Sequence, residues 1–222
     1  MRVIAFVPMR HDSERVPGKN YRDLGGRPLF HHILATLSDV PQIERIVVDT
    51  DSPIIIRSCR ESFPDVVCVE RPEHLRDGHL PMTAVLQHDV SLFPSDWYLQ
   101  THSTNPLLTS TTVRTAIQRL SSDTAGHDSL FSVSRIQGRL FGPNATPLNH
   151  DPSALLRTQD LEPVFLENSN LYLFTGAQLA EGRRFGDDPL LFEIDPWEAV
   201  DIDTEPEFRI AEALFNARGA TR

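Results

Sequence analysis

The chain has 222 residues, with 21 basic and 31 acidic side chains, so its formal net charge at pH 7 is 21 − 31 = −10. This acidic balance argues against a nucleic-acid binder or a protein that attaches to anionic membranes, because such binding needs a dense basic surface. The composition, 40% hydrophobic and 23% charged, is typical of a globular protein. We therefore expect one domain over residues 1–222, with neither nucleic acid nor membrane among its partners.

The sequence contains no apolar stretch that approaches the roughly 18 residues needed to span a membrane. The apolar run at residues 3–7 is ended by Pro8. It is too short for the apolar core of a signal peptide, so we interpret it as a buried first strand. Cys59 and Cys68 have neither a metal-site spacing nor a disulfide framework, which favours a reduced, cytoplasmic location.

Strand-like and helix-like segments alternate through about the first 135 residues. The strands are predicted at 3–7, 45–51, 66–69, 97–102 and 129–134, and the helices at 28–37, 52–63, 81–93 and 109–120. Apolar strands separated by helices are typical of parallel βαβ units that are covered on both faces. The predicted fold class is α/β, a Rossmann-like three-layer sandwich with a mostly parallel sheet.

The pattern breaks at about residues 137–163, which are rich in glycine, proline and asparagine. A segment of this length without a core of its own is usually functional or docks onto a partner. We interpret it as an inserted dimerisation arm and expect a homodimer. Strand signals resume at 171–174, 190–194 and 201–204, and a helix is predicted over 206–217.

The loop after the first strand contains three cations, a hydroxyl and an amide: Arg10, Arg15, Lys19, Ser13 and Asn20. In an open α/β sheet, ligands bind beyond the carboxyl ends of the strands, where this loop would lie. Arginine offers a planar fork to phosphate oxygens, and lysine offers a compact point charge. With one glycine, the loop is neither a Walker loop nor a dinucleotide fingerprint. The residues indicate a polyphosphate-binding loop, and the alternative is a solvated polar loop without a ligand.

Lys19 is the one lysine of the chain, since the other 20 basic residues are arginines. Compositional bias explains the excess of arginine, but it does not explain why the lysine stands in this loop. We therefore single out Lys19 as a candidate phosphate contact.

Asp201 and Asp203 flank Ile202 near the end of the chain. If this segment is a short strand, alternation places both carboxylates on one side and Ile202 toward the core. Two hard oxygen ligands on one face suit Mg²⁺, which commonly combines one or two carboxylates with water and phosphate. The alternative is that Asp203 caps the following helix.

Five segments, taken in chain order, fit one known pattern. They are Arg10-x-x-Ser13-x-x-x-Pro17-x-Lys19-Asn20, Glu70-Arg71-Pro72-x-x-Leu75, His102-Ser103-Thr104-Asn105-Pro106-Leu107, Asn168-Ser169-x-x-Tyr172 and Glu198-Ala199-Val200-Asp201-Ile202-Asp203. This pattern resembles the acylneuraminate cytidylyltransferases, which are the CMP-sialic acid synthetases and their relatives for other nonulosonic acids and Kdo. The resemblance spans about residues 1–217.

The resemblance implies that the anomeric hydroxyl of a 2-keto-3-deoxy sugar acid attacks the α-phosphate of CTP, with Mg²⁺ as cofactor, and that CMP-sugar and pyrophosphate are released. The implied catalytic residues are Lys19, Arg10 and Asp203, and the implied nucleotide-binding residues are Arg10, Ser13, Arg15, Lys19, Asn20, Arg71 and Thr83. The sugar would be bound by Gln100, His102, Arg157, Gln159 and Asn168, and Mg²⁺ by Asp201 and Asp203.

Some positions depart from the family pattern. Glu14 places a negative charge in the phosphate loop, and His102 stands where many relatives have a glutamine. Arg157 would reach the sugar carboxylate across a dimer, or else it pairs with Asp160. Two other functions stay open, namely a sugar-nucleotide-dependent glycosyltransferase of similar fold and a catalytically decayed nucleotide-sensing module.

Overall fold

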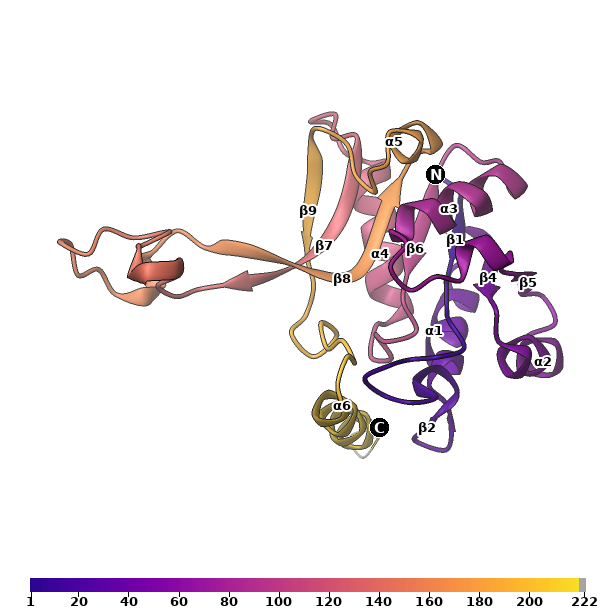
Figure 1. Cartoon of the computed structure of the whole chain (residues 1–222). Helices are drawn as coiled ribbons and strands as arrows, with labels where there is room; N and C mark the ends of the chain where they lie inside the picture. Colours follow the sequence, from indigo (N-terminus) through magenta and orange to yellow (C-terminus); the bar gives the residue numbers. More distant parts are fainter. Residues whose placement is uncertain (220–222) are drawn as a thin grey trace.

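The protein is described by a computed structural model over residues 1–219, and its centre is a seven-stranded sheet in the order β5-β4-β1-β6-β8-β7-β9 (Figure 1). The strands are β1 (Val3–Phe6), β4 (Ile43–Thr50), β5 (Val67–Glu70), β6 (Tyr98–Thr101), β7 (Ser129–Ile136), β8 (Val164–Phe174) and β9 (Pro189–Glu193). The first four neighbours pair in parallel, β8 runs antiparallel to β6 and β7, and β9 is parallel to β7. The predicted mostly parallel sheet is confirmed.

Helices cover both faces of the sheet. They are α1 (Leu29–Ser38), α2 (Pro53–Ser62), α3 (Met82–Leu92), α4 (Ser110–Ser121) and α5 (Gly176–Ala180). Buried side chains of α1, α2 and α4 pack into one apolar cluster with β1 and β4, while α3 and α5 pack into a second cluster on the other face. This arrangement confirms the predicted three-layer sandwich, because each helix buries one apolar stripe against the sheet.

Local capping explains two of the helix boundaries. The Ser52 hydroxyl accepts a hydrogen bond from the backbone N–H of Ile55 at the start of α2, and Thr109 does the same for Thr112 at the start of α4. Such caps satisfy backbone donors that have no partner inside the helix. Because β1 and β6 are parallel neighbours, their carboxyl ends lead into loops on one edge of the sheet.

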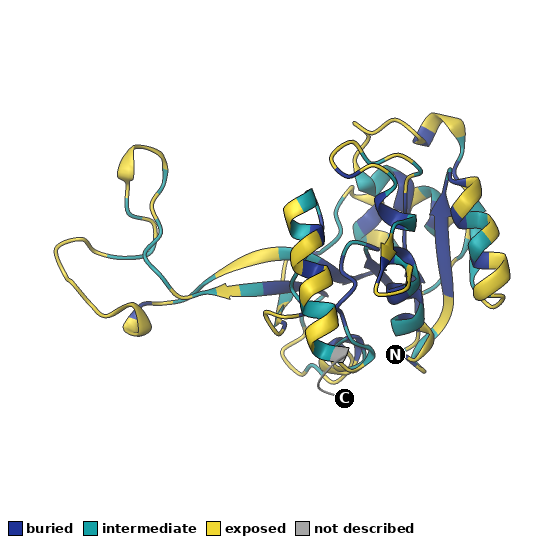
Figure 2. Cartoon of the chain, turned by 90° about the horizontal axis from the view of Figure 1, so that it is seen from below, coloured by how far each residue is buried: buried dark blue, intermediate teal, exposed yellow. Residues whose placement is uncertain are grey.

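The segment between β7 and β8 projects far from the body of the molecule (Figure 1). Figure 2 shows that most of this arm is exposed or half-buried. β8 begins at Val164, seven residues before the predicted Leu171, because its ladder with β7 continues outward past the polar residues 167–170. The arm and its base expose six large apolar side chains: Phe141, Leu148, Leu155, Leu156, Phe165 and Leu166.

A third, smaller core lies outside the main sheet and is called here the C-terminal core. It joins the loop after β1, the hairpin β2 (Asp23–Leu24) and β3 (Arg27–Pro28), and the last helix, α6 (Glu205–Gly219). Its buried members are Val16, Leu24, Leu29, Ile202, Phe208 and Ala211. The prediction of a strand at 201–204 is wrong, because this segment has no strand partner in the sheet. It is held instead by the buried Ile202 side chain and by a 3.0 Å hydrogen bond from Ile202 N–H to the Thr104 carbonyl.

No helix within residues 1–219 is long and apolar enough to cross a membrane.

Two adjacent glycines test whether α6 docks as described. Gly25 and Gly26 both have positive φ, at 61° and 88°, but only at Gly25 would a Cβ clash, with the Phe215 ring of α6. Either substitution to alanine should cost about 1 kcal/mol of backbone strain. Gly25→Ala should cost a further ~1–3 kcal/mol through overpacking. The two free energies of unfolding, measured with urea, should differ accordingly, and equal losses would contradict the docking of α6.

Candidate functional site

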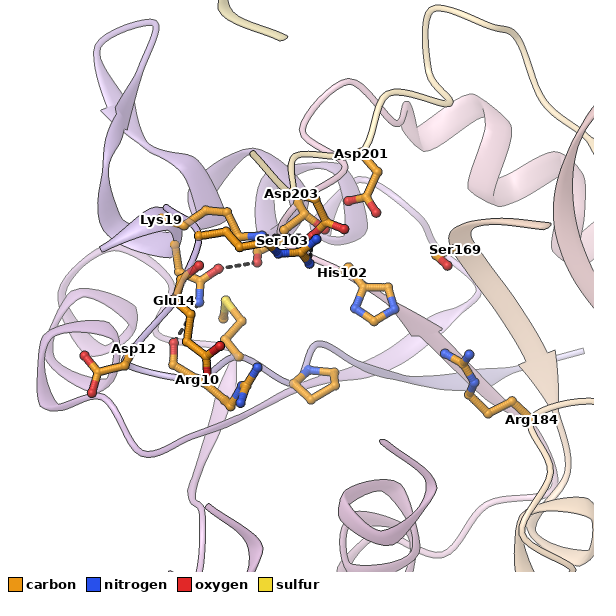
Figure 3. A pocket seen from close by; sticks show the side chains of 16 residues that line it. Arg10, Asp12, Glu14, Lys19, His102, Ser103, Ser169, Arg184, Asp201 and Asp203 are labelled. Carbon is orange, nitrogen blue, oxygen red and sulfur yellow. Dashed lines mark hydrogen bonds and ion pairs between the residues drawn. The ribbon is translucent and has the colours of Figure 1, made fainter. Parts of the chain in front are cut away.

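A polar pocket of about 420 Å³ lies at the carboxyl ends of β1 and β6 (Figure 3). Its lining comes from five parts of the chain: Pro8, Met9, Arg10, Asp12, Ser13, Glu14, Arg15, Lys19 and Asn20 of the first loop, His102, Ser103 and Thr104 after β6, Ser169 of β8, Arg184 of the loop between α5 and β9, and Asp201 and Asp203. The sequence places the first loop and the acidic pair almost 200 residues apart. The structure brings them together at the sheet edge where ligands of α/β proteins bind.

Lys19 is the contact between the loop and the acidic segment. Its Nζ donates a 2.5 Å hydrogen bond to the carbonyl oxygen of Ile202 and lies 3.5 Å from Oδ1 of Asp203. Arg15 Nη2 lies 2.9 Å from the same Asp203 oxygen. The Lys19 side chain is only 11% exposed, whereas that of Arg15 is 63% exposed. Lys19 is thus a fixed charge on the pocket wall, and Arg15 is free to turn toward a ligand.

The side chain of Asn20 is occupied by contacts within the protein. Its amide group donates to the carbonyl oxygen of Arg10 at 2.8 Å, and its Oδ1 accepts a 2.6 Å hydrogen bond from the Ser103 hydroxyl. Asn20 therefore fastens the two ends of the loop to each other and to the segment after β6. Its predicted contact with cytidine stays a prediction.

The first loop also contributes Arg10, Ser13 and Glu14 to the pocket lining. Glu14 extends into the same space as Arg10 (Figure 3). Arg10 packs against Gly78, where any larger residue would collide with its guanidinium. A cation and a carboxylate therefore lie near each other at this end of the pocket.

A second cavity of about 260 Å³ adjoins the first through Pro8 and Arg10, and Arg71 lines it. The Arg71 guanidinium is buried and ion-paired with Asp49. Beside this pair, burial and the Asp49 charge raise the pKa of Asp89 to about 8. Thr83 lies on α3 one residue after Met82, which lines the cavity, but Thr83 is not among its lining residues. Arg71 is thus anchored to the protein at the wall of a cavity next to the main pocket.

The far end of the main pocket is formed by His102, Ser169 and Arg184, and the buried Gln100 contacts His102 and Arg184. Arg184 donates to Oε1 of Gln100 at 3.0 Å, which turns the Gln100 amide N–H toward Nε2 of His102, 2.7 Å away. Burial and the Arg184 charge lower the pKa of His102 to about 4. His102 is therefore neutral near pH 7 and accepts this hydrogen bond.

Ser169 and Arg184 are pocket residues that sequence reasoning missed. Ser169 has φ of 56°, the left-handed conformation that favours glycine. Its place in the Asn168-Ser169-x-x-Tyr172 motif was a usable signal. Arg184 lies in an irregular loop between α5 and β9, and no motif or periodicity marks it.

Four of the predicted sugar-binding residues, namely Gln100, Arg157, Gln159 and Asn168, do not line the pocket of a single chain. Arg157 and Gln159 are exposed on the arm, and Arg157 pairs with Asp160 at 2.7 and 3.0 Å. Asn168 is hydrogen-bonded to β7 through Ser132 and Ser134. Any contact of the arm with a sugar stays a prediction.

The two aspartates suit a divalent cation. Asp201 Oδ1 is buried and has no hydrogen-bond partner within residues 1–219. Burial raises the pKa of Asp201, although a hydrogen bond from Thr104 opposes this. At the start of α6, Glu207 accepts the backbone N–H groups of Asp203 and Thr204 at 2.9 and 2.7 Å, while Oδ1 of Asp203 faces Arg15 and Lys19. No cluster of three or more His, Cys, Asp or Glu ligands occurs in the described part of the chain, so water and phosphate would complete the coordination.

The low pKa of His102 predicts a pH-dependent stability. Between about pH 6.5 and 4 the unfolded chain protonates this histidine and the folded chain does not, so stability falls as the pH falls. From pH 7 to pH 5 the wild type should lose about 1–2 kcal/mol more than His102→Gln, which lacks the titrating group. The contribution of the other histidines cancels in this comparison of urea unfolding curves. Parallel losses in the two proteins would show that His102 is not desolvated.

Comparisons with known proteins agree with this geometry. The sequence profile of the family described as "Cytidylyltransferase" matches residues 4–203. The CMP-N,N'-diacetyllegionaminic acid synthase of Legionella pneumophila is 30% identical, with 97% of each chain covered. The N-acylneuraminate cytidylyltransferase of Oncorhynchus mykiss is 28% identical over 95% of this chain, which spans 49% of that relative.

Among solved structures, CMP:2-keto-3-deoxy-manno-octonic acid synthetase complexed with CTP superposes with a TM-score of 0.74 at 15% identity, covering 98% of this chain and 100% of the other. A 4-diphosphocytidyl-2C-methyl-D-erythritol synthase superposes with a TM-score of 0.66 at 14% identity, over 96% and 99% of the two chains. At such identities these likenesses establish the fold. The profile match over most of its length and the 30% identical relative show that the chain belongs to the cytidylyltransferase family.

Proposed function

We propose that this protein transfers the cytidylyl group of CTP to a 2-keto-3-deoxy sugar acid of the nonulosonic acid type, releasing pyrophosphate. The observation that carries the proposal is Lys19, held between the Ile202 carbonyl and Asp203 on the wall of a polar pocket. The full-length similarity to the Legionella synthase supports N,N'-diacetyllegionaminic acid or a close relative as the acceptor.

The first loop would hold the triphosphate. Arg10 and Arg15 are exposed cations, Arg15 is paired with the Asp203 carboxylate, and phosphate oxygens accept bidentate hydrogen bonds from a guanidinium fork. Ser13 adds a hydroxyl from the same loop. Exposed ion pairs such as Arg15–Asp203 contribute little to stability, so their exchange for a ligand costs little. The loop is therefore built to change partners when CTP binds.

Lys19 would act on the transition state. Its charge is fixed before the reaction and needs no reorganisation when negative charge develops on the α-phosphate. The hydroxyl of the sugar acid attacks the α-phosphorus, the bond from this phosphorus to the bridging β-phosphate oxygen breaks, pyrophosphate leaves with the electron pair, and the hydroxyl proton is released to solvent. A single preorganised donor of this kind typically lowers the barrier by ~3–4 kcal/mol.

Asp201 and Asp203 would hold Mg²⁺. When bound, the ion would neutralise phosphate charge and orient the leaving group. The unpartnered, buried Asp201 oxygen supports this assignment, because an isolated buried carboxylate oxygen is otherwise costly.

The arm would form a homodimer. Its six exposed apolar side chains, among them Leu155 at 87% and Leu148 at 65% exposure, support a role in burying surface against a second copy. In a dimer, Arg157 and Gln159 on the arm of one subunit would come within range of the pocket of the other subunit. The location in the cell that we propose is the cytoplasm.

The function is tested by incubating the protein with Mg²⁺, each nucleoside triphosphate and a panel of nonulosonic acids and Kdo. We expect pyrophosphate with CTP and a sugar acid together, and a loss of activity when the metal is chelated. CTP binding without turnover would favour the nucleotide-sensing module. Release of nucleotide from a sugar nucleotide, with no turnover of CTP, would favour the glycosyltransferase.

The role of Lys19 is tested by two substitutions. Lys19→Ala should lower kcat by about 100-fold or more, in keeping with the loss of one preorganised donor. Lys19→Arg should also lose activity, because a planar guanidinium cannot occupy the position of a compact ammonium group between Ile202 and Asp203. Arg119→Lys, a charge-conserving exchange on α4, serves as the control. A near-normal kcat in Lys19→Arg would contradict the phosphate role and favour compositional bias.

A further inference from the structure

The main pocket has cations at two separate ends. Arg10, Arg15 and Lys19 all come from the loop after β1, whereas Arg184 enters from the loop between α5 and β9. Figure 3 shows Arg184 on the far side of His102 from the phosphate loop. With three cations at the phosphate end, Arg184 is placed to meet a second negative charge that is separate from the triphosphate.

The charge of Arg184 is oriented but only partly neutralised. Its guanidinium lies 3.9 Å from the centre of the Tyr172 ring, and one nitrogen donates to Gln100. The nearest carboxylate, Glu167, is 3.7 Å away, which is too far for a hydrogen bond, and it accepts a hydrogen bond from the Tyr172 hydroxyl. The side chain of Arg184 is 24% exposed. Stacking on one face and one hydrogen bond leave further N–H donors for a planar anion.

The neighbouring residues supply no competing cation at this end. Gln100 is uncharged, and His102 is kept neutral because it is buried next to Arg184. Ser169 offers a hydroxyl across the pocket. A carboxylate bound here would therefore depend on Arg184 for its charge and could take hydrogen bonds from its polar neighbours.

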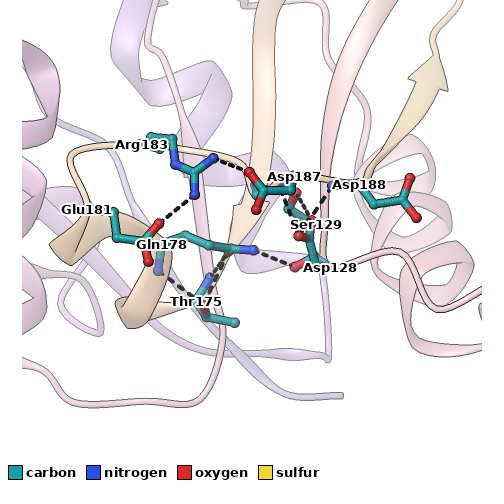
Figure 4. Close-up of polar contacts among 9 residues, drawn as sticks. Asp128, Ser129, Thr175, Gln178, Glu181, Arg183, Asp187 and Asp188 are labelled. Carbon is teal, nitrogen blue, oxygen red and sulfur yellow. Dashed lines mark hydrogen bonds and ion pairs between the residues drawn. The ribbon is translucent and has the colours of Figure 1, made fainter.

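The loop that contains Arg184 is clamped to the start of β7 (Figure 4). The Asp128 carboxylate accepts the backbone N–H groups of Asp187 at 2.8 Å and Asp188 at 3.3 Å, and Gly186 N–H donates to the Ser129 hydroxyl at 2.8 Å. A Cβ at Gly186 would clash with the Asp128 carboxylate, so the loop approaches as closely as glycine allows. Arg184 is thus held in place before any ligand binds, which reduces the entropy cost of binding.

We propose that Arg184 is the residue of this chain that binds the carboxylate of the sugar acid acceptor, and that Gln100 and Tyr172 are its positioning residues. This inference rests on the proposed function, since it assigns one group of the proposed acceptor to one side chain. An arginine fork matches a carboxylate in a bidentate manner. It would also offset the repulsion between the acceptor carboxylate and the triphosphate, whose charges would otherwise oppose binding in one pocket.

The test compares Arg184→Ala with the wild type, using CTP and two probes, N,N'-diacetyllegionaminic acid and its C1 carboxamide. For the acid, the variant should raise KM by about 30-fold or more, the range expected for a lost charge-assisted bidentate contact. For CTP, KM should change less than about 3-fold. The neutral carboxamide, which offers no charge to Arg184, should be turned over by both proteins with kcat/KM values within about 3-fold.

Three further variants sharpen the test. Arg184→Lys keeps the charge but not the fork, so it should recover part of the lost affinity for the acid. Arg183→Ala is the matched control, because Arg183 points away to Glu181 and Asp187 in exposed pairs (Figure 4). Arg157→Ala examines the rival carboxylate contact from the arm. A CTP titration by calorimetry checks that each variant is folded with an intact nucleotide site.

The inference is overturned if Arg184→Ala leaves the KM for the acid within about 3-fold of wild type. It is equally overturned if the substitution lowers kcat/KM for the acid and for the carboxamide by the same factor. It is also overturned if Arg157→Ala, and not Arg184→Ala, raises the KM for the acid selectively. Failure of the proposed function looks different, because the wild type itself would then release no pyrophosphate from CTP with any sugar acid.

Discussion

The site depends on the C-terminal core, in which Val16 of the first loop and Ile202 of the acidic segment are buried together against Phe208 of α6. Neither segment belongs to the main sheet, and a loop of this length has no reason to hold one conformation by itself. Burying Val16 and Ile202 fixes both backbones, and each buried aliphatic side chain contributes roughly 1.5–3 kcal/mol. Their polar neighbours, Lys19 and Asp203, are then brought face to face.

The distribution of charge follows from that contact. The chain as a whole is acidic, yet the pocket gathers Arg10, Arg15, Lys19 and Arg184 within one cavity. Asp203 pairs with Arg15 and Lys19, Glu14 lies near Arg10, and Arg184 is only partly neutralised by Glu167. Lys19 also donates a hydrogen bond to the Ile202 carbonyl oxygen, so it stays in place when phosphate groups replace the carboxylate partners.

Much of this could be predicted from sequence, for identifiable reasons. The strands and helices of the first 135 residues follow the periodicity of the apolar residues and the positions of helix-capping residues. Lys19, Asp201 and Asp203 stand in motifs that depend on local spacing. The antiparallel direction of β8 could not be predicted, because it depends on the arm that reverses the chain. The segment at 201–204 has the alternating pattern of a strand, because polar residues flank Ile202. A single buried side chain produces the same pattern without a sheet partner.

The surroundings of several site residues could not be predicted from sequence, because tertiary contacts decide them. Arg184 is brought to the pocket by the Asp128 clamp, which joins residues about 60 positions apart. Asn20 has the residue type of a base-binding group, yet Arg10 and Ser103 occupy its side chain. Arg157 fits a carboxylate contact in the motif, but in one chain it lies on an exposed arm beside Asp160.

If the proposed function is correct, one active site exchanges the pyrophosphate of CTP for a sugar acid. A ³¹P NMR time course of CTP with N,N'-diacetyllegionaminic acid, Mg²⁺ and the protein tests this exchange. We expect the three CTP resonances to be replaced by pyrophosphate and one phosphodiester resonance of a CMP-sugar, in equal molar amounts. Appearance of orthophosphate and CDP, or of pyrophosphate with free CMP from the start, would contradict it.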